Sequence, residues 1–230
     1  MTPKTKVYLL PGTMCDERLW QYVTDILPQS FQCHMVDLPL EDSIDNIVLR
    51  LNDILPREPV NLVGFSLGGY IAAQYTLQYP DQVRRLMVLA NSPAKLPTFE
   101  VKMREAALLA AKNAGYGGIL RTKINQLLSP QHKNNEQIIN VIKAMDDSGG
   151  KAKFISQVEA TTSRQNLTGP LAALDKPIQF VFGDHDALVN KDLLLNLNAP
   201  QINTHIITNC GHMSPLEQPQ QVAKHIATFF

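Results

Sequence analysis

Short apolar runs alternate with amphipathic stretches along most of the 230-residue chain. Each run ends at glycine, proline or a polar cluster, which is typical of buried strands. Six strands are expected, at residues 6–12, 31–39, 60–65, 83–91, 177–183 and 202–209. Apolar residues at helical spacing predict helices between and after them, at residues 17–27, 43–55, 67–79 and 218–230. The pattern therefore predicts an α/β fold, with a mostly parallel sheet covered by helices on both faces.

The alternation of strands and helices stops between Asn91 and Pro177. About 80 residues there predict helices only, at residues 102–114, 119–128, 135–147 and 151–163. An all-helical insertion between two strands is expected to form a cap over the strand ends. We therefore divide the chain into a core, residues 1–92 and 171–230, and a helical cap subdomain, residues 93–170.

Several large apolar side chains of the predicted cap are candidates for the roof of a binding pocket. At helical spacing such residues more often form the internal core of the cap than contact a ligand. These residues are Phe99, Met103, Tyr116, Ile119 and Phe154.

Composition and charge narrow the classes of function. The formal net charge is zero, which argues against nucleic acid as a partner because phosphate binding needs a basic excess. No apolar run approaches the roughly 20 residues that span a bilayer, and the first residues lack the apolar core of a signal peptide. The three cysteines are far apart and form no CxxC pair, as expected of reduced thiols. We expect a cytoplasmic protein that binds neither nucleic acid nor membranes.

Charge is distributed unevenly along the chain. Residues 95–170 hold 11 Lys and Arg against 6 Asp and Glu, whereas the rest holds 10 against 15. The basic excess of the cap could attract an anionic substrate over an acidic body. The same lysines could instead form an ordinary solvated helix face.

One serine lies where a predicted strand turns into a helix, in the stretch NLVGFSLGGYIAAQYTLQYP. A sharp turn there strains the backbone at Ser66 and leaves no room for side chains two positions away, where Gly64 and Gly68 stand. The turn lifts the hydroxyl above the sheet, at the amino end of a helix that favours an anion. This G-x-S-x-G pattern indicates a nucleophile, although a glycine-rich turn could also serve packing alone.

A serine nucleophile needs a base, and the base needs an orienting carboxylate. Of the six histidines, only His212 lies between the last predicted strand and the final helix. Asp184 and Asp186 both follow the fifth strand, at the same edge of the sheet as Ser66. The neighbouring Cys210 is an alternative, thiol nucleophile, but no comparable turn supports it.

Acyl transfer also needs donors for the developing oxyanion. The backbone N–H of Leu67, directly after the serine, is one candidate. Thr13, in the exit loop of the first strand, is the candidate for the second donor through its own backbone N–H.

These motifs resemble the α/β-hydrolase superfamily, and the likeness covers nearly the whole chain. The matched segments are LLPGTMCDERLW, HMVDLP, VNLVGFSLGG, RRLMVLANSP, FGDHDALV and NCGHMSPLEQP. The resemblance is closest to small bacterial esterase-like members with a helical lid. In that family the acid stands three residues after the glycine of the FG turn, which implies Asp186 rather than Asp184.

The resemblance implies a serine hydrolase that cleaves a small-molecule carboxylic ester through Ser66, His212 and Asp186, with an acyl-enzyme intermediate. A thioesterase, a lactonase or a C–C bond hydrolase would use the same triad. A non-catalytic receptor for a small ligand is the alternative from another class. No cofactor or metal is expected, since the sequence carries no metal-ligand cluster and no nucleotide-binding loop.

Overall fold

The computed structural model describes residues 3–230 and holds six strands there in one parallel sheet. Their spatial order is β2-β1-β3-β4-β5-β6. The strands are β1 (Thr5–Leu10), β2 (Phe31–Met35), β3 (Val60–Phe65), β4 (Val83–Leu89), β5 (Ile178–Gly183) and β6 (Ile202–Ile207). All six predicted strands and the α/β class are confirmed; the sheet is parallel throughout.

The strand order reverses at the centre of the sheet. The chain runs from β1 to the edge strand β2 and then returns to β3 on the opposite side of β1. Leu10, at the end of β1, lies in register with Gly64 of β3. The exit loops of these two strands therefore start side by side, which is the usual place for ligands in open α/β sheets.

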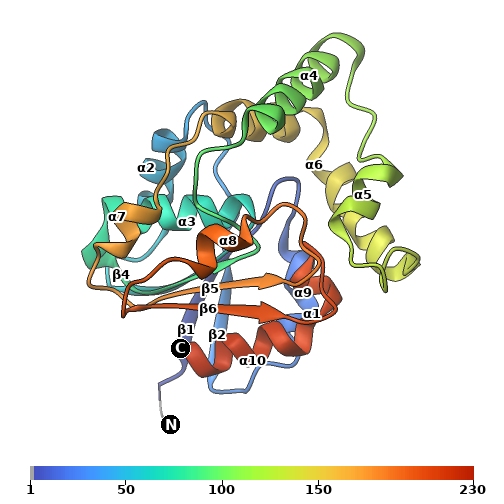
Figure 1. The fold of residues 1–230 in the computed structure, drawn as a ribbon. Coiled ribbons are helices and arrows are strands. Elements are labelled where there is room, and N and C mark those ends of the chain that lie inside the picture. Colours follow the sequence, from blue (N-terminus) through green and yellow to red (C-terminus); the bar gives the residue numbers. More distant parts are fainter. Residues whose placement is uncertain (1–2) are drawn as a thin grey trace.

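Helices cover both faces of the sheet because successive strand residues point to opposite sides. Tyr8 and Leu10 join one buried cluster, and Val7 and Leu9 join the other. In Figure 1, α2, α3 and α7 lie on one side of the sheet and α1 and α10 on the other. The core helices are α1 (Gln21–Thr24), α2 (Ile44–Ile54), α3 (Leu67–Gln78), α7 (Thr168–Ala172), α8 (Lys191–Leu195), α9 (Ser214–Glu217) and α10 (Pro219–Phe229).

The segment predicted as one helix at residues 17–27 is shorter and broken. It forms a 3-10 turn, η1 (Glu17–Leu19), and then the single turn of α1. The Asp16 carboxylate caps η1 by accepting the Arg18 N–H at 3.0 Å. Pro28 disfavours helical backbone angles in the residue before it, and α1 ends at Thr24, before the predicted end at residue 27. Leu19 and Val23 are buried, whereas Ile26, beyond the end of α1, is 45% exposed.

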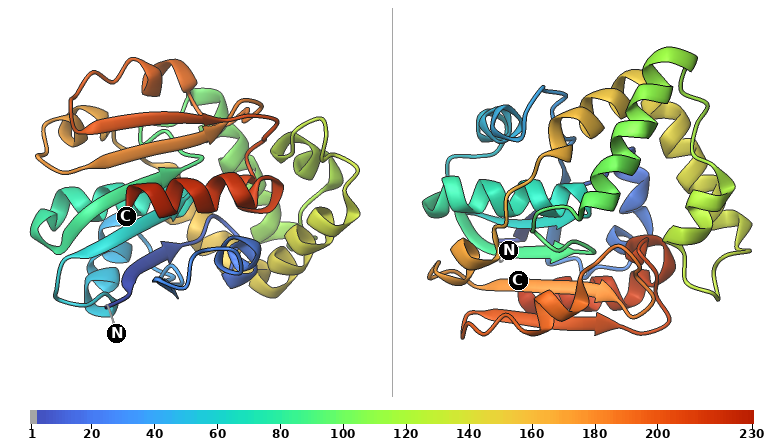
Figure 2. Two further views of the ribbon diagram at one scale, coloured as in Figure 1. Left: turned by 90° about the horizontal axis from the view of Figure 1, so that it is seen from below. Right: turned by 45° about the horizontal axis from the view of Figure 1, so that its top comes forward.

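The stretch between β4 and β5 is helical, as predicted. It contains α4 (Thr98–Ala114), α5 (Arg121–Leu127) and α6 (Glu136–Thr162). Both views of Figure 2 show these helices grouped at one end of the sheet. The two helices expected at residues 135–147 and 151–163 are the two segments of α6, which are separated at Gly150 by a non-helical backbone with φ 62° and ψ −171°. The exact division into core and cap stays a prediction, and residues 1–2 of that core lie outside the described residues.

The apolar residues proposed for the roof or core of the cap separate into two groups. Phe99 and Met103 are 67% and 59% exposed, so they do not form the internal core of the cap. Tyr116 stacks on Phe154 with ring centroids 4.4 Å apart, and the partly buried Ile119 packs on a core cluster. These three belong to the internal packing of the cap. Within residues 3–230, no helix has the length and apolar character to cross a membrane.

Candidate active site

The turn between β3 and α3 has the geometry that its glycines predict. Ser66 adopts φ 50° and ψ −115°, a conformation that non-glycine residues rarely adopt. A Cβ on Gly64 would lie 2.2 Å from the Gly68 carbonyl oxygen, and a Cβ on Gly68 would lie 2.4 Å from the Pro11 carbonyl oxygen. The Ser66 N–H donates to the Leu89 carbonyl at 2.9 Å, which ties the strained residue to β4.

A continuous hydrogen-bonded chain joins the serine to an imidazole and a carboxylate. Ser66 Oγ lies 2.9 Å from His212 Nε2, and His212 Nδ1 lies 2.9 Å from Asp186 Oδ2. The same carboxylate accepts the backbone N–H groups of Leu188 at 2.9 Å and Val189 at 3.3 Å, which fix its orientation. His212 and Asp186 are only 5% and 1% exposed. The carboxylate selects the tautomer with Nδ1 protonated and leaves Nε2 free to accept the serine proton.

The two aspartates of the β5 exit turn have different partners. Asp184 accepts the N–H groups of Asn209 and Cys210, both at 3.0 Å, and closes the loop before His212. Partial burial acts to raise the pKa of Asp184, but these amide bonds hold it below its usual value. Asp186 is therefore the carboxylate that contacts the imidazole, and Asp184 shapes the loop that carries it.

The exit loop of β1 lies directly against the serine turn. A Cβ on Gly12 would come within 3.2 Å of the Ser66 Cβ. Within residues 3–230, the backbone N–H groups of Thr13 and Leu67 donate no hydrogen bond. Leu67 is the first residue of α3, where helix geometry leaves the N–H without an internal partner. Two free amides next to the serine are what an oxyanion hole requires.

The cap holds the β1 exit loop through contacts that sequence analysis did not find. The Met14 N–H donates to Gln157 Oε1 at 2.9 Å, and Lys153 Nζ donates to the Cys15 carbonyl at 2.8 Å. Met14 has φ 57°, so this contact stabilises an unfavourable backbone conformation next to Thr13. The partners lie more than 130 positions apart in the chain, and no local pattern marks them.

The cap also holds the histidine loop. The His212 N–H donates to the Leu127 carbonyl of α5 at 2.7 Å. The buried Glu217 carboxylate accepts the Ser129 N–H at 2.7 Å and the Met213 N–H at 3.1 Å. The sequence did contain a signal for this contact, because the glutamate lies in the matched segment NCGHMSPLEQP.

The two cysteines near the site, Cys15 and Cys210, are free and buried. Burial raises the pKa of Cys15 to about 12, and it also raises the pKa of Cys210. Cys210 is fully buried, and its Sγ faces the Gly211 carbonyl at 3.4 Å. A thiolate nucleophile at Cys210 therefore has no support in the structure.

Comparison with known proteins gives the family. The family model for the alpha/beta hydrolase fold matches residues 37–219, which is most of the chain. The chain belongs to this family. It is an α/β-hydrolase enzyme.

The similar proteins align with nearly the full length of this α/β-hydrolase. It is 26% identical to the pimeloyl-[acyl-carrier protein] methyl ester esterase of Aeromonas hydrophila, over 96% of this chain and 93% of that protein. It is 25% identical to the human monoacylglycerol lipase ABHD6, over 98% of this chain and 75% of the lipase. The structure of a thermophilic esterase from Thermogutta terrifontis superposes with a TM-score of 0.85 at 20% identity, covering 98% of this chain and 89% of the other. That last likeness supports the fold.

Proposed function

We propose that this α/β-hydrolase is a serine esterase that cleaves a small-molecule carboxylic ester, with Ser66 as nucleophile, His212 as base and Asp186 as orienting acid. The observation that carries the proposal is the unbroken chain of contacts from Ser66 Oγ through the imidazole to the carboxylate, each 2.9 Å long. The Aeromonas relative is named as a methyl ester esterase and the human relative as a monoacylglycerol lipase, and both names support ester hydrolysis.

In the first half of the reaction, His212 Nε2 takes the proton of Ser66 as Oγ attacks the acyl carbon. The carbonyl oxygen becomes negatively charged and accepts the free N–H groups of Thr13 and Leu67. Asp186 stabilises the imidazolium that forms. Removing one such oxyanion donor typically costs a factor of about 10² to 10³ in kcat.

In the second half, the imidazolium gives its proton to the departing alkoxide, and the acyl group stays on Ser66. His212 then activates a water molecule, which attacks the acyl-enzyme and releases the acid. The steps use side chains and backbone amides of this chain, so the proposal needs no cofactor. A thioester, a lactone or a C–C bond next to a carbonyl would engage the same groups.

The test is labelling with a fluorophosphonate probe, together with turnover of short nitrophenyl esters. We expect the wild type to be labelled and active and Ser66→Ala to be neither, whereas Ser30→Ala, at an exposed serine outside the site, behaves as the wild type. Labelling that persists in Ser66→Ala would contradict the role of the nucleophile. A wild type that binds esters tightly without turnover would support a receptor instead.

A further inference from the structure

A buried arginine lies where the cap returns to the core, directly after α6. Arg164 is 8% exposed, and its Nε donates to the Thr161 carbonyl at 2.8 Å. Its guanidinium lies over the Tyr70 ring, 5.0 Å from the centroid. Within the described part of the chain, the two Nη groups donate no hydrogen bond and Arg164 forms no ion pair.

An arginine in this environment lacks the neutralising group that buried charges normally have. The nearest acidic influence is Glu100, but its carboxylate pairs with Arg104 at 3.3 Å. Burial, followed by the charge of Arg104, lowers the pKa of Arg164 to about 9. The guanidinium thus remains charged at neutral pH, and the Tyr70 ring offsets only part of the cost of its burial.

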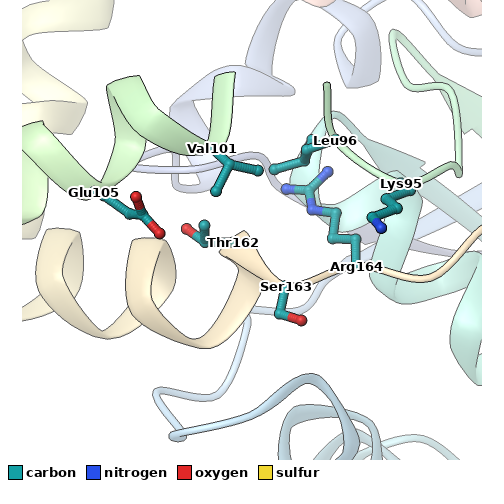
Figure 3. Close-up of a pocket in the computed structure, with 7 residues that line it drawn as sticks. All are labelled: Lys95, Leu96, Val101, Glu105, Thr162, Ser163 and Arg164. Carbon is teal, nitrogen blue, oxygen red and sulfur yellow. The ribbon is translucent and has the colours of Figure 1, made fainter. Parts of the chain in front are cut away.

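The guanidinium borders a cavity of about 310 Å³ between the start of α4 and the end of α6. Figure 3 shows Lys95 near the guanidinium, with Leu96 and Val101 along the same wall. Glu105 is exposed and lies at the opposite end of the view. The cavity therefore offers two cations at one end and apolar surface beside them, in a volume that suits a small organic acid.

Tyr70 links the Arg164 guanidinium to the helix that carries the proposed nucleophile. Tyr70, under the guanidinium, donates its N–H to the Ser66 carbonyl at 3.2 Å. It stands one turn further along α3, which is about 6 Å along the helix axis. The Tyr70 hydroxyl both accepts the Gln165 N–H at 3.0 Å and donates to the Gln165 carbonyl at 3.1 Å. The ring that supports Arg164 is therefore held in place on the helix that begins at the nucleophile turn.

We propose that the Arg164 cavity is an anion-binding subsite and that the preferred substrates carry an ionised carboxylate beyond the scissile ester, as monoesters of dicarboxylic acids do. The proposal rests on the proposed esterase function. A carboxylate fits because its two oxygens can accept both free Nη groups side by side. With Glu105, the guanidinium and Lys95 give the lining a net charge of +1, which suits a single negative charge. Lys95 and Arg164 come from the two segments that connect cap and core.

The first test compares each monomethyl ester of succinate, glutarate and adipate with the corresponding dimethyl ester. We expect the wild type to prefer at least one monoester by tenfold or more in kcat/KM. Arg164→Gln should lower kcat/KM for that monoester by about 10- to 100-fold, as expected for loss of a charge-assisted bidentate pair. The same variant should leave the diester within about threefold, because the diester has no carboxylate to lose.

Matched variants separate binding from folding. Arg164→Lys keeps the charge and should retain part of the monoester preference, and Lys95→Gln should weaken it slightly. Lys102→Gln, at an exposed position of α4 outside the cavity, should leave it unchanged. Equal losses on monoester and diester in Arg164→Gln, or a wild type without any monoester preference, would overturn the proposal.

A binding measurement distinguishes this proposal from the esterase function. Glutarate is titrated calorimetrically into Ser66→Ala, with and without Arg164→Gln. Glutarate binding that depends on Arg164 supports the subsite. If such binding is found but no ester is turned over, the esterase function is refuted and the subsite is not. Ester turnover without glutarate binding would refute the subsite alone. Inorganic phosphate that binds where glutarate does not would overturn the assignment to carboxylates.

Discussion

At the scale of single residues, two aspartates two positions apart have different expected roles. Asp186 contacts the imidazole, whereas Asp184 accepts backbone amides of the loop before it. Asp186→Asn should lower kcat by about 10³- to 10⁴-fold, because an amide cannot hold the required tautomer of His212 or stabilise the imidazolium. Steady-state kinetics with a nitrophenyl ester measures the loss.

Asp184→Asn is the matched control, because it changes the same residue type in the same turn without touching His212. Its kcat should stay within a few-fold of the wild type. Equal losses in both variants would mean that the turn as a whole, rather than the carboxylate of Asp186, supports catalysis.

The control variant carries a second prediction, for stability. The pKa of Asp184 in the folded protein lies below its usual value, so its ionised form contributes stability above about pH 4, the unfolded value. That contribution is lost as pH falls through the folded pKa. The difference in free energy of unfolding between the wild type and Asp184→Asn should thus be largest near neutral pH and shrink in acid. Urea unfolding at a series of pH values measures it, and a difference that grows in acid would contradict the assignment.

Residue types and spacing predicted the serine turn because Gly64 and Gly68 stand where any side chain would collide with nearby backbone atoms. They could not predict that Gln157 accepts the Met14 N–H, since that contact depends on where the cap lies over the core. The sequence also could not predict that Arg164 is buried without an ion-pair partner in the described part of the chain, because no local pattern distinguishes a buried arginine from an exposed one.

At the scale of elements, the packing of β1 against α3 depends on one glycine. A Cβ on Gly68 would collide with the Pro11 carbonyl at 2.4 Å and the Leu10 carbonyl at 2.6 Å. These are backbone atoms of the strand exit and cannot rotate away. Gly68→Ala should therefore lower the free energy of unfolding by about 3 kcal/mol or more, measured by urea denaturation.

Gly169 in α7 provides the comparison, since a Cβ there meets nothing within 4 Å. Gly169→Ala should leave stability unchanged or raise it by up to about 1 kcal/mol, because alanine favours helix. If both variants lost stability to the same degree, close approach of β1 and α3 would not be the cause of the Gly68 effect.

Strands and helices with a clear hydrophobic periodicity were predicted well, whereas the short helices α7, α8 and α9 were not predicted. All six strands and α2, with its Ser43 cap, follow the expected pattern. Helices α7, α8 and α9 are four or five residues long, which is too short for a helical repeat to show. Their position depends on local caps, such as the Asn190 side chain that accepts the Leu193 N–H at the start of α8.

At the scale of the whole molecule, the sheet topology brings the site together. The strand order reverses between β1 and β3, so the oxyanion candidate and the nucleophile leave adjacent strands. Leu127 and Gln157 of the cap then fix the histidine loop and the β1 exit loop from above. Because both contacts come from the cap, the candidate site is complete only when cap and core are packed together.

The charge distribution of the whole molecule leads to a last prediction. The net charge of zero is the sum of a basic excess in residues 95–170 and an equal acidic excess in the rest of the chain. A negatively charged monoester should be attracted toward the cap, and this attraction is screened as the Debye length falls from about 30 Å at 0.01 M salt to about 3 Å at 1 M. Over that range, kcat/KM for the monoester should fall about tenfold, while that for the neutral diester changes little. An equal salt effect on both esters would indicate a general change in the enzyme. An effect on the monoester alone would indicate that the basic residues of the cap attract the same anion that Arg164 binds.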